Sequence, residues 1–188
     1  MEDQYERICT FADRSNEENQ RSHHAGEIVI FGSTYMSHFP LYELINKCIF
    51  ENAVYNRSIE GLTTKEALEI VNDCVIAIHP SKLFLAVGEE DANNPDAVQE
   101  YTKLVAELRS RLPQCHLYLI GLTGGTPFAE NFNRKIQHLC DDKNTEYICF
   151  VTNRTSENAL YKARFKQLSC FFRSGSLTLI DAFNSVSI

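Results

Sequence analysis

The chain has 188 residues and a formal net charge of -7, and hydrophobic residues make up 44% of it. This length suits one domain with a full hydrophobic core. A nucleic-acid-binding protein needs a basic face, so the acidic balance disfavours that class, and no apolar run is long enough to span a membrane. The seven scattered cysteines form no C-x-x-C pair, which favours reduced thiols in a cytoplasmic protein.

The first 25 residues are polar, and we interpret them as an N-terminal extension to a domain over residues 26–188. Residues 5–11 could form a short helix that packs on this domain, whereas residues 13–26 are typical of a linker. The acidic start has neither the basic residues nor the apolar core of a secretion signal.

From residue 27 onward, apolar runs alternate with amphipathic patterns. Strands are predicted at residues 28–31, 53–56, 83–87, 116–122 and 147–151. Helices are predicted at residues 40–49, 64–78, 96–112, 128–140, 158–168 and 177–186. Such alternation predicts a three-layer α/β fold of the flavodoxin type, with a doubly wound, five-stranded parallel sheet between helices.

The first predicted strand ends on Gly32, which is followed at once by the hydroxyl residues Ser33 and Thr34. In open α/β folds, ligands bind at the carboxyl edge of the sheet, and the N–H groups of a following helix suit an anion or oxyanion. This is the geometry of a turn that presents a nucleophile. Either hydroxyl could instead serve only as a helix N-cap.

Two later loops are predicted to open on the same edge of the sheet. The loop at residues 56–64, NRSIEGLTT, contains Arg57 and Gly61, and the loop at residues 87–94 contains Glu90 and Asp91. The carboxyl ends of parallel strands meet at one edge, so we expect Thr34, Gly61 and Glu90 to lie close together.

These loops resemble the sequence blocks of the SGNH hydrolases, also called the GDSL lipases and esterases, and the resemblance runs from about residue 27 to the C-terminus. Residues 31–34, FGST, are similar to the family's F-G-D-S block, and NRSIEGLTT is similar to N-R-G-I-x-G-D-T-T. Residues 88–91, GEED, are similar to G-x-N-D, and residues 175–182, GSLTLIDA, are similar to the D-G-x-H-x-N block. The resemblance implies the same doubly wound fold.

The resemblance also assigns family roles to positions of this chain, and most of these positions are substituted. The nucleophilic serine falls on Thr34, and the aspartate before it falls on Ser33. Of the two oxyanion donors, the glycine falls on Gly61 and the asparagine falls on Glu90. The aspartate and histidine of the last block fall on Gly175 and Thr178, so the catalytic base is missing.

Three other residues could modify this cleft. His38 lies four residues after Thr34 and could replace the lost base, although a surface or packing histidine is the alternative. Arg57 could pair with Glu90 and neutralise it. Asp91 belongs to an acidic run, residues 89–91, that is either a small cation site or a solvated acidic loop.

We therefore expect a catalytically degenerate SGNH-like protein. It would bind a small-molecule ligand or a partner through the cleft where the family has its active site. The alternative is a carboxylic-ester hydrolase with a rebuilt site around Thr34 and His38. A third alternative is an interaction module whose cleft is filled by its own side chains. No cofactor, metal, nucleic acid or membrane insertion is expected, and the sequence does not identify the ligand or the protein partner.

Overall fold

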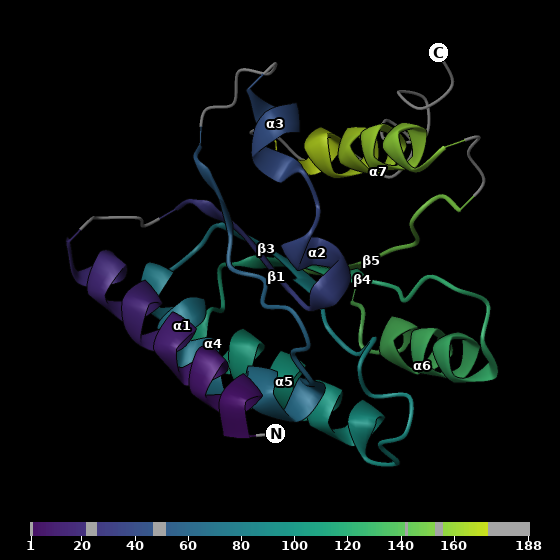
Figure 1. The fold of residues 1–188 in the computed structure, drawn as a ribbon, viewed down its shortest axis with the longest axis horizontal. Helices are drawn as coiled ribbons and strands as arrows, with labels where there is room; N and C mark the ends of the chain where they lie inside the picture. Colours follow the sequence, from purple (N-terminus) through teal and green to yellow (C-terminus); the bar gives the residue numbers. More distant parts are fainter. Residues whose placement is uncertain (1, 22–25, 47–51, 142, 153–155, 173–188) are drawn as a thin grey trace.

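The computed structural model describes residues 2–21, 26–46, 52–141, 143–152 and 156–172. Five parallel strands form one sheet in the order β2-β1-β3-β4-β5, with helices on both faces (Figure 1). The strands are β1 (Ile28–Gly32), β2 (Val54–Asn56), β3 (Lys82–Ala86), β4 (His116–Ile120) and β5 (Thr145–Ile148). This arrangement confirms the predicted doubly wound α/β fold.

The described residues contain seven α-helices and a short 3-10 helix, η1 (Ile76–Ile78). The helices are α1 (Glu2–Arg21), α2 (Thr34–Ser37), α3 (Leu41–Ile45), α4 (Thr64–Cys74), α5 (Ala97–Arg111), α6 (Pro127–Gln137) and α7 (Glu157–Phe171). The helix expected after the turn at Ser33 is the short α2, whose bounds the sequence did not predict, and one continuous helix was predicted where α4 and η1 are separate. The predicted helix at 177–186 and the end of the one at 40–49 lie outside the described residues.

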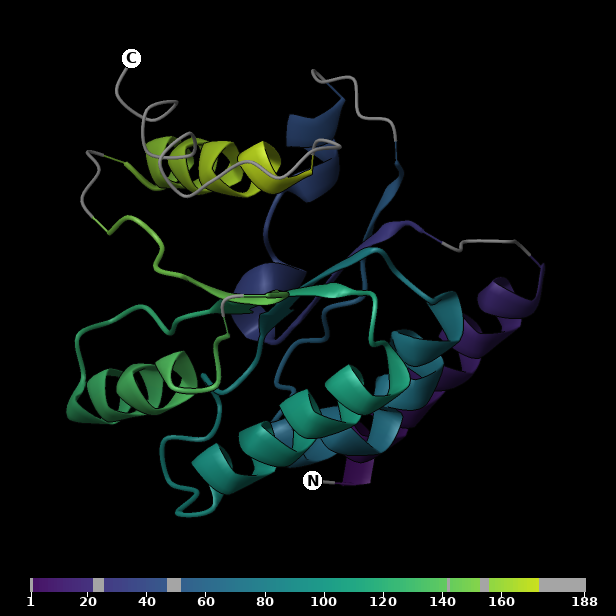
Figure 2. The same cartoon turned by 180° about the vertical axis from the view of Figure 1, so that it is seen from behind.

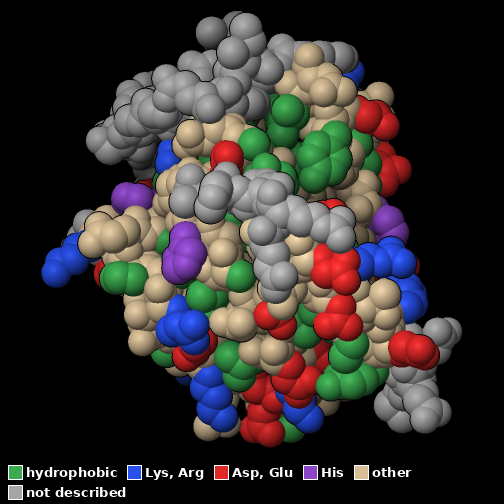
Figure 3. Space-filling view, turned by 90° about the vertical axis from the view of Figure 1, so that its left-hand side faces the viewer, with side chains coloured by type: hydrophobic (Ala, Val, Ile, Leu, Met, Phe, Trp, Pro, Cys, Tyr) green, Lys and Arg blue, Asp and Glu red, His purple; other side chains and the backbone are tan. Residues whose placement is uncertain are grey.

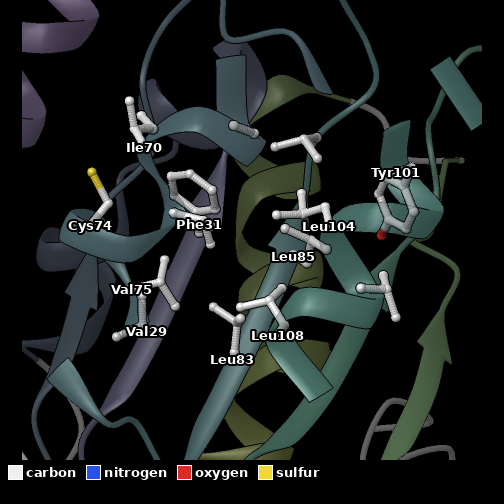
Figure 4. Packing of buried hydrophobic residues seen from close by; sticks show 14 of the residues in the cluster. Val29, Phe31, Ile70, Cys74, Val75, Leu83, Leu85, Tyr101, Leu104 and Leu108 are labelled. Carbon is white, nitrogen blue, oxygen red and sulfur yellow. The ribbon is translucent and has the colours of Figure 1, made fainter. Parts of the chain in front are cut away.

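Alternate side chains of each strand enter two separate cores. Val29 and Phe31 of β1 face one core, and Ile28 and Ile30 face the other, as the period of two in a strand requires. Helices α1, α4, α5 and α6 cover the first face, and α2, α3 and α7 cover the second (Figures 1 and 2). Figure 4 shows the first core, where leucines of β3 and α5 pack beside Phe31.

The N-terminal segment is one long helix, so the predicted linker at 13–26 is wrong over the part that α1 occupies. Ile8 and Ala12 of α1 are buried in the first core, and α1 packs along α4. Two side-chain amides fasten the ends of α1: Gln4 donates to the carbonyl of Gly61 at 2.6 Å, and Asn19 donates to that of Asp73 at 2.8 Å. The division into an extension and a domain at residue 26 stays a prediction.

Acidic and basic side chains are interspersed on the face shown in Figure 3, and the apolar areas between them are small. None of the helices in the described ranges combines the length and the apolar character that a membrane span requires.

The packing of α1 predicts a measurable loss of stability when its buried face is cut back. Ile8 is 1% exposed, and replacing a buried isoleucine by alanine costs about 2–5 kcal/mol. We expect Ile8→Ala to lower the free energy of unfolding by an amount in this range, measured by urea denaturation. Thr10→Ala, on the exposed side of α1, is the control, and equal stability of the two variants would contradict the docking of α1.

Candidate functional site

Three loops at the carboxyl edge of the sheet bring Thr34, Gly61 and Glu90 into direct contact. The hydroxyl Oγ1 of Thr34 donates to Oε1 of Glu90 at 2.5 Å and accepts a hydrogen bond from the N–H of Gly61 at 2.9 Å. The loops after β1, β2 and β3 supply these residues, as the parallel topology predicts. The hydroxyl therefore has a fixed donor and a fixed acceptor within the protein.

Gly61 is a position that strongly favours glycine. Its φ is +78°, a left-handed conformation that side chains with a Cβ rarely adopt. A Cβ at this position would also lie 2.7 Å from Nε2 of Gln4, the side chain from α1 that bonds the Gly61 carbonyl. The N-terminal helix thus contacts the loop that positions the Gly61 N–H.

Two of the three residues in the acidic run at 89–91 bind backbone N–H groups of the protein, and Glu90 is exposed. Oε1 of Glu89 accepts from the N–H of Tyr35 at 2.6 Å, and Asp91 accepts from both the N–H and the hydroxyl of Thr64, at 2.9 and 3.0 Å. Asp91 is 1% exposed and binds the first residue of α4. In the described part of the chain, no three metal-ligating side chains are grouped together.

Arg57 does not pair with Glu90, so that prediction is wrong. Its Nη1 lies 3.0 Å from a carboxylate oxygen of Glu18 and 3.0 Å from the hydroxyl of Ser15, both on α1. The side chain is buried against this helix. The physical reason is that α1 supplies a carboxylate to this arginine, which a flexible linker would not have done.

His38 and Ser33 do not contact the Thr34 hydroxyl. His38 follows the last residue of α2, and its Nε2 lies 3.8 Å from a carboxylate oxygen of Glu60. Ser33 is fully buried at the N-cap position of α2, but its hydroxyl makes no capping hydrogen bond and has no partner among the described residues. Ser33 therefore occupies the N-cap position of α2, but its side chain does not cap the helix.

Gly175 and Thr178 lie outside the described residues. They follow α7, whose last residue, Phe171, accepts a hydrogen bond at its carbonyl from Lys82, the first residue of β3. The end of α7 is therefore at the amino edge of the sheet, opposite to Thr34. The connection from β5 to α7 is the one that opens at the carboxyl edge.

The first half of α7 contributes residues to the cleft that sequence reasoning missed. The ring of Tyr35 stacks on Tyr161 of α7 at 6.0 Å and contacts Phe39 and Phe150 at 5.9 and 6.2 Å. The guanidinium of Arg164 lies over the ring of Tyr35, 4.7 Å from its centroid. The only signal in the sequence was that Tyr35 follows Thr34 directly.

These rings leave little free space. The cavity beside Tyr35 has a volume of about 20 Å³, which is room for about one water molecule. Its walls are Tyr35, Met36, Ala86, Glu89, Ile120, Gly121, Leu122, Thr123 and Phe150.

Glu89 is the acidic group that lines this cavity. Burial raises the pKa of its carboxyl group above the ordinary value. The hydrogen bond from the Tyr35 N–H lowers this pKa, but by less. The neighbouring charge of Glu90 raises the pKa further, and His38 has a smaller opposite effect. The net direction of the shift is upward.

No family model matches this sequence, and no curated protein matches it. Solved structures do match its fold. A Streptococcus pneumonia protein with the provisional name platelet activating factor superimposes with a TM-score of 0.76 at 18% identity, covering 90% of this chain and 93% of that one.

Two other solved structures carry names that identify the fold. A GDSL-like lipase from Bacteroides thetaiotaomicron has a TM-score of 0.62 at 14% identity, with 93% of each chain covered. AlinE4, an SGNH-hydrolase family esterase, has a TM-score of 0.52 at 16% identity, covering 66% of this chain and 75% of that one. The chain therefore has the fold of the SGNH hydrolases.

Proposed function

We propose that this chain is a catalytically degenerate SGNH-fold protein that acts by binding a partner and not by hydrolysing esters. The observation that carries this proposal is the bonding of the Thr34 hydroxyl, which donates to Glu90 and accepts from Gly61. A nucleophile needs a base for its proton and free donors aimed at the developing oxyanion. Here the Gly61 N–H already binds the hydroxyl itself.

Glu90 opposes catalysis at the position where the family has an asparagine. A carboxylate cannot donate a hydrogen bond, and the loss of one oxyanion donor costs about 3 kcal/mol in comparable sites. When ionised, Glu90 also places a negative charge 2.5 Å from the oxygen that would attack. Arg57 does not offset this charge because it pairs with Glu18.

The chain also offers no histidine in the part that would supply the base. No histidine follows His138 in the sequence, so neither the connection from β5 to α7 nor the C-terminal segment contains one. His38 faces Glu60 at 3.8 Å, while the proton of Thr34 goes to Glu90. Loss of a general base typically costs a factor of about 10² to 10⁴ in rate.

The small cavity supports a partner over a buried small molecule. Small-molecule sites usually have volumes of about 300–1,000 Å³. The cavity of about 20 Å³ beside Tyr35 is far smaller, because the rings of Tyr35, Phe150 and Tyr161 fill the cleft. We propose the cytoplasm as its location, since the six cysteines of the described residues are free thiols.

One observation favours the second candidate, an ester hydrolase rebuilt around Thr34. The short contact between Thr34 and Glu90 joins a hydroxyl to a carboxylate, which is a pairing that could move a proton. In this case Glu90, and not His38, would be the base. The two candidates differ in whether Thr34 and Glu90 support turnover.

We expect no hydrolysis of a short-chain aryl ester above the buffer rate, because the hydroxyl lacks a suitable base and the oxyanion lacks donors. The wild type, Thr34→Ala and Glu90→Gln should give the same rate, measured by release of the coloured phenolate, with Thr10→Ala as the control. A wild-type rate that falls by a factor of about 10² or more in both site variants would establish the rebuilt enzyme.

We expect Glu89→Gln to be more stable than the wild type at neutral pH. A carboxyl group with a raised pKa in the folded state destabilises the protein once it is ionised, so this cost is present at neutral pH and absent below the ordinary Glu range of about pH 4. Glutamine removes the charge and keeps an oxygen that accepts from Tyr35. The advantage in melting temperature should therefore shrink as the pH falls.

The control for this experiment is Glu6→Gln, which removes an exposed carboxylate from α1. It should change the melting temperature little at any pH. If Glu89→Gln were less stable than the wild type at pH 7, the ionised carboxylate would be stabilising, and the argument from burial would be wrong.

A further inference from the structure

Helix α1 is attached to the sheet by few buried apolar side chains. It has 20 residues, and among those whose burial is described the buried hydrophobic ones are Ile8 and Ala12, with Phe11 half-buried beside them. Helix α5 has only 15 residues and buries five, among them Tyr101. Because burial of apolar surface is the main favourable term in folding, releasing α1 costs less than unfolding the sheet.

Polar side chains supply further contacts of α1, and water can replace them. Ser15 and Glu18 bind the guanidinium of Arg57, and the side chain of Glu18 is 64% exposed. An ion pair with an exposed partner contributes little to stability. The Nε of Arg57 is buried and has no hydrogen-bond partner among the described residues, so it gains one from water when α1 leaves.

The loop between β2 and α4 is held from two sides. The carbonyl of Gly61 accepts from Gln4 of α1 at 2.6 Å, and its N–H donates to the hydroxyl of Thr34 at 2.9 Å. The start of the loop is bound to β1 instead, because the N–H groups of Arg57 and Ile59 donate to carbonyls of that strand. Loss of α1 therefore leaves the start of the loop in place and frees its tip at Gly61.

We propose that α1 is a latch, which opens as a unit while the sheet stays folded and thereby releases Gly61 from the Thr34 hydroxyl. The two bonds of Gly61 are then coupled, so that weakening the bond to Gln4 or the bond to Thr34 favours the open state. In the open state the Gly61 N–H is free to bind another oxygen acceptor in the cleft. This control of the N–H does not depend on whether the cleft binds or reacts.

Two buried thiols distinguish the opening of α1 from unfolding of the whole chain. Cys74, the last residue of α4, is fully buried, and the hydroxyl of Ser15 on α1 lies against it. Burial raises its pKa to about 11, so the docked thiol reacts slowly near neutral pH. Cys115 follows α5, which packs on α4 and α6, and burial raises its pKa to about 12. Cys74 therefore becomes reactive when α1 opens, and Cys115 only when the core unfolds.

The experiment measures alkylation of each thiol by iodoacetamide in the full chain, at urea concentrations below the unfolding transition. Peptide mass spectrometry follows each cysteine separately, and each rate is divided by that of the same cysteine in the unfolded chain. The reagent is dilute enough that α1 recloses faster than it is alkylated, so this ratio reports the population of the open form. All samples carry Cys9→Ser, because a label on this partly exposed thiol would itself disturb α1.

We expect Cys74 to react at least tenfold faster than Cys115 on this scale. Ile136→Val, in the core under α6, should accelerate Cys115 by about 2- to 10-fold and leave Cys74 unchanged, because Ile136 stays buried when α1 opens. Ile8→Ala should accelerate both thiols by the same factor, since it destabilises the docked form relative to both other states. Thr10→Ala, on the exposed side of α1, is the control and should change neither rate.

Gln4→Met and Thr34→Val test the coupling between α1 and the cleft. Each removes one of the two bonds of Gly61 and keeps a side chain of similar size, and each should accelerate Cys74 several-fold. In Gln4→Met, exchange of the Gly61 N–H with deuterated water, followed by NMR, should rise by the same factor as the alkylation of Cys74. If Thr34→Val accelerates Cys115 alone, α1 opens without releasing Gly61, and the link to the cleft is wrong.

The latch is wrong if Cys74 and Cys115 react at the same normalised rate and Ile136→Val accelerates both, because α1 then leaves only when the whole chain unfolds. It is also wrong if Gln4→Met leaves the rate of Cys74 unchanged. Ile136→Val and Gln4→Met are mild changes, so they decide the question even where Ile8→Ala fails to fold. Circular dichroism melting of each variant checks the fold.

Discussion

Three consecutive carboxylates after β3 hold the carboxyl edge of this protein together. Glu89 binds the backbone of α2, Glu90 binds the Thr34 hydroxyl, and Asp91 binds the start of α4. Each of these contacts joins segments that are far apart in the chain and satisfies a donor that would otherwise need water. The acidic loop therefore fixes the relative positions of the two loops that precede α2 and α4, and the rest of the cleft is built around them.

This loop gives the proposed loss of ester hydrolysis a structural basis. Glu90 anchors Thr34 by accepting the hydrogen bond of its hydroxyl. A carboxylate at this position donates no hydrogen bond to an oxyanion, so under the proposed function this anchoring takes the place of the family's reaction. On the other side of the cleft, Tyr35 packs on Phe150 and on Tyr161 of α7, and these rings take the space that a substrate would need.

The sequence was sufficient to predict the five-stranded parallel sheet and the close approach of Thr34, Gly61 and Glu90. Both follow from local patterns, because alternating strands and helices make a parallel sheet and the ends of its strands share one edge. The partner of Arg57 and the full length of α1 could not be predicted, since each depends on the other across a wide sequence separation. The aromatic cluster around Tyr35 was missed for the same reason.

The last block of the family resemblance, at residues 175–182, lies outside the described residues and stays a prediction. It rested on matching apolar positions after α7, and α7 ends at the amino edge, where Lys82 binds Phe171. Apolar spacing alone does not say at which edge of the sheet a segment emerges.

The docking of α1 also orders events during synthesis. Asn19 on α1 binds the carbonyl of Asp73, 54 residues further along the chain. Translation at about 5–20 residues per second delays that partner by several seconds. An isolated helix is marginal in water, and Ile8 has no core to enter until α4 has emerged from the ribosome. Helix α1 is thus stabilised only after α4 has been made, and for those seconds a chaperone can bind its apolar stripe.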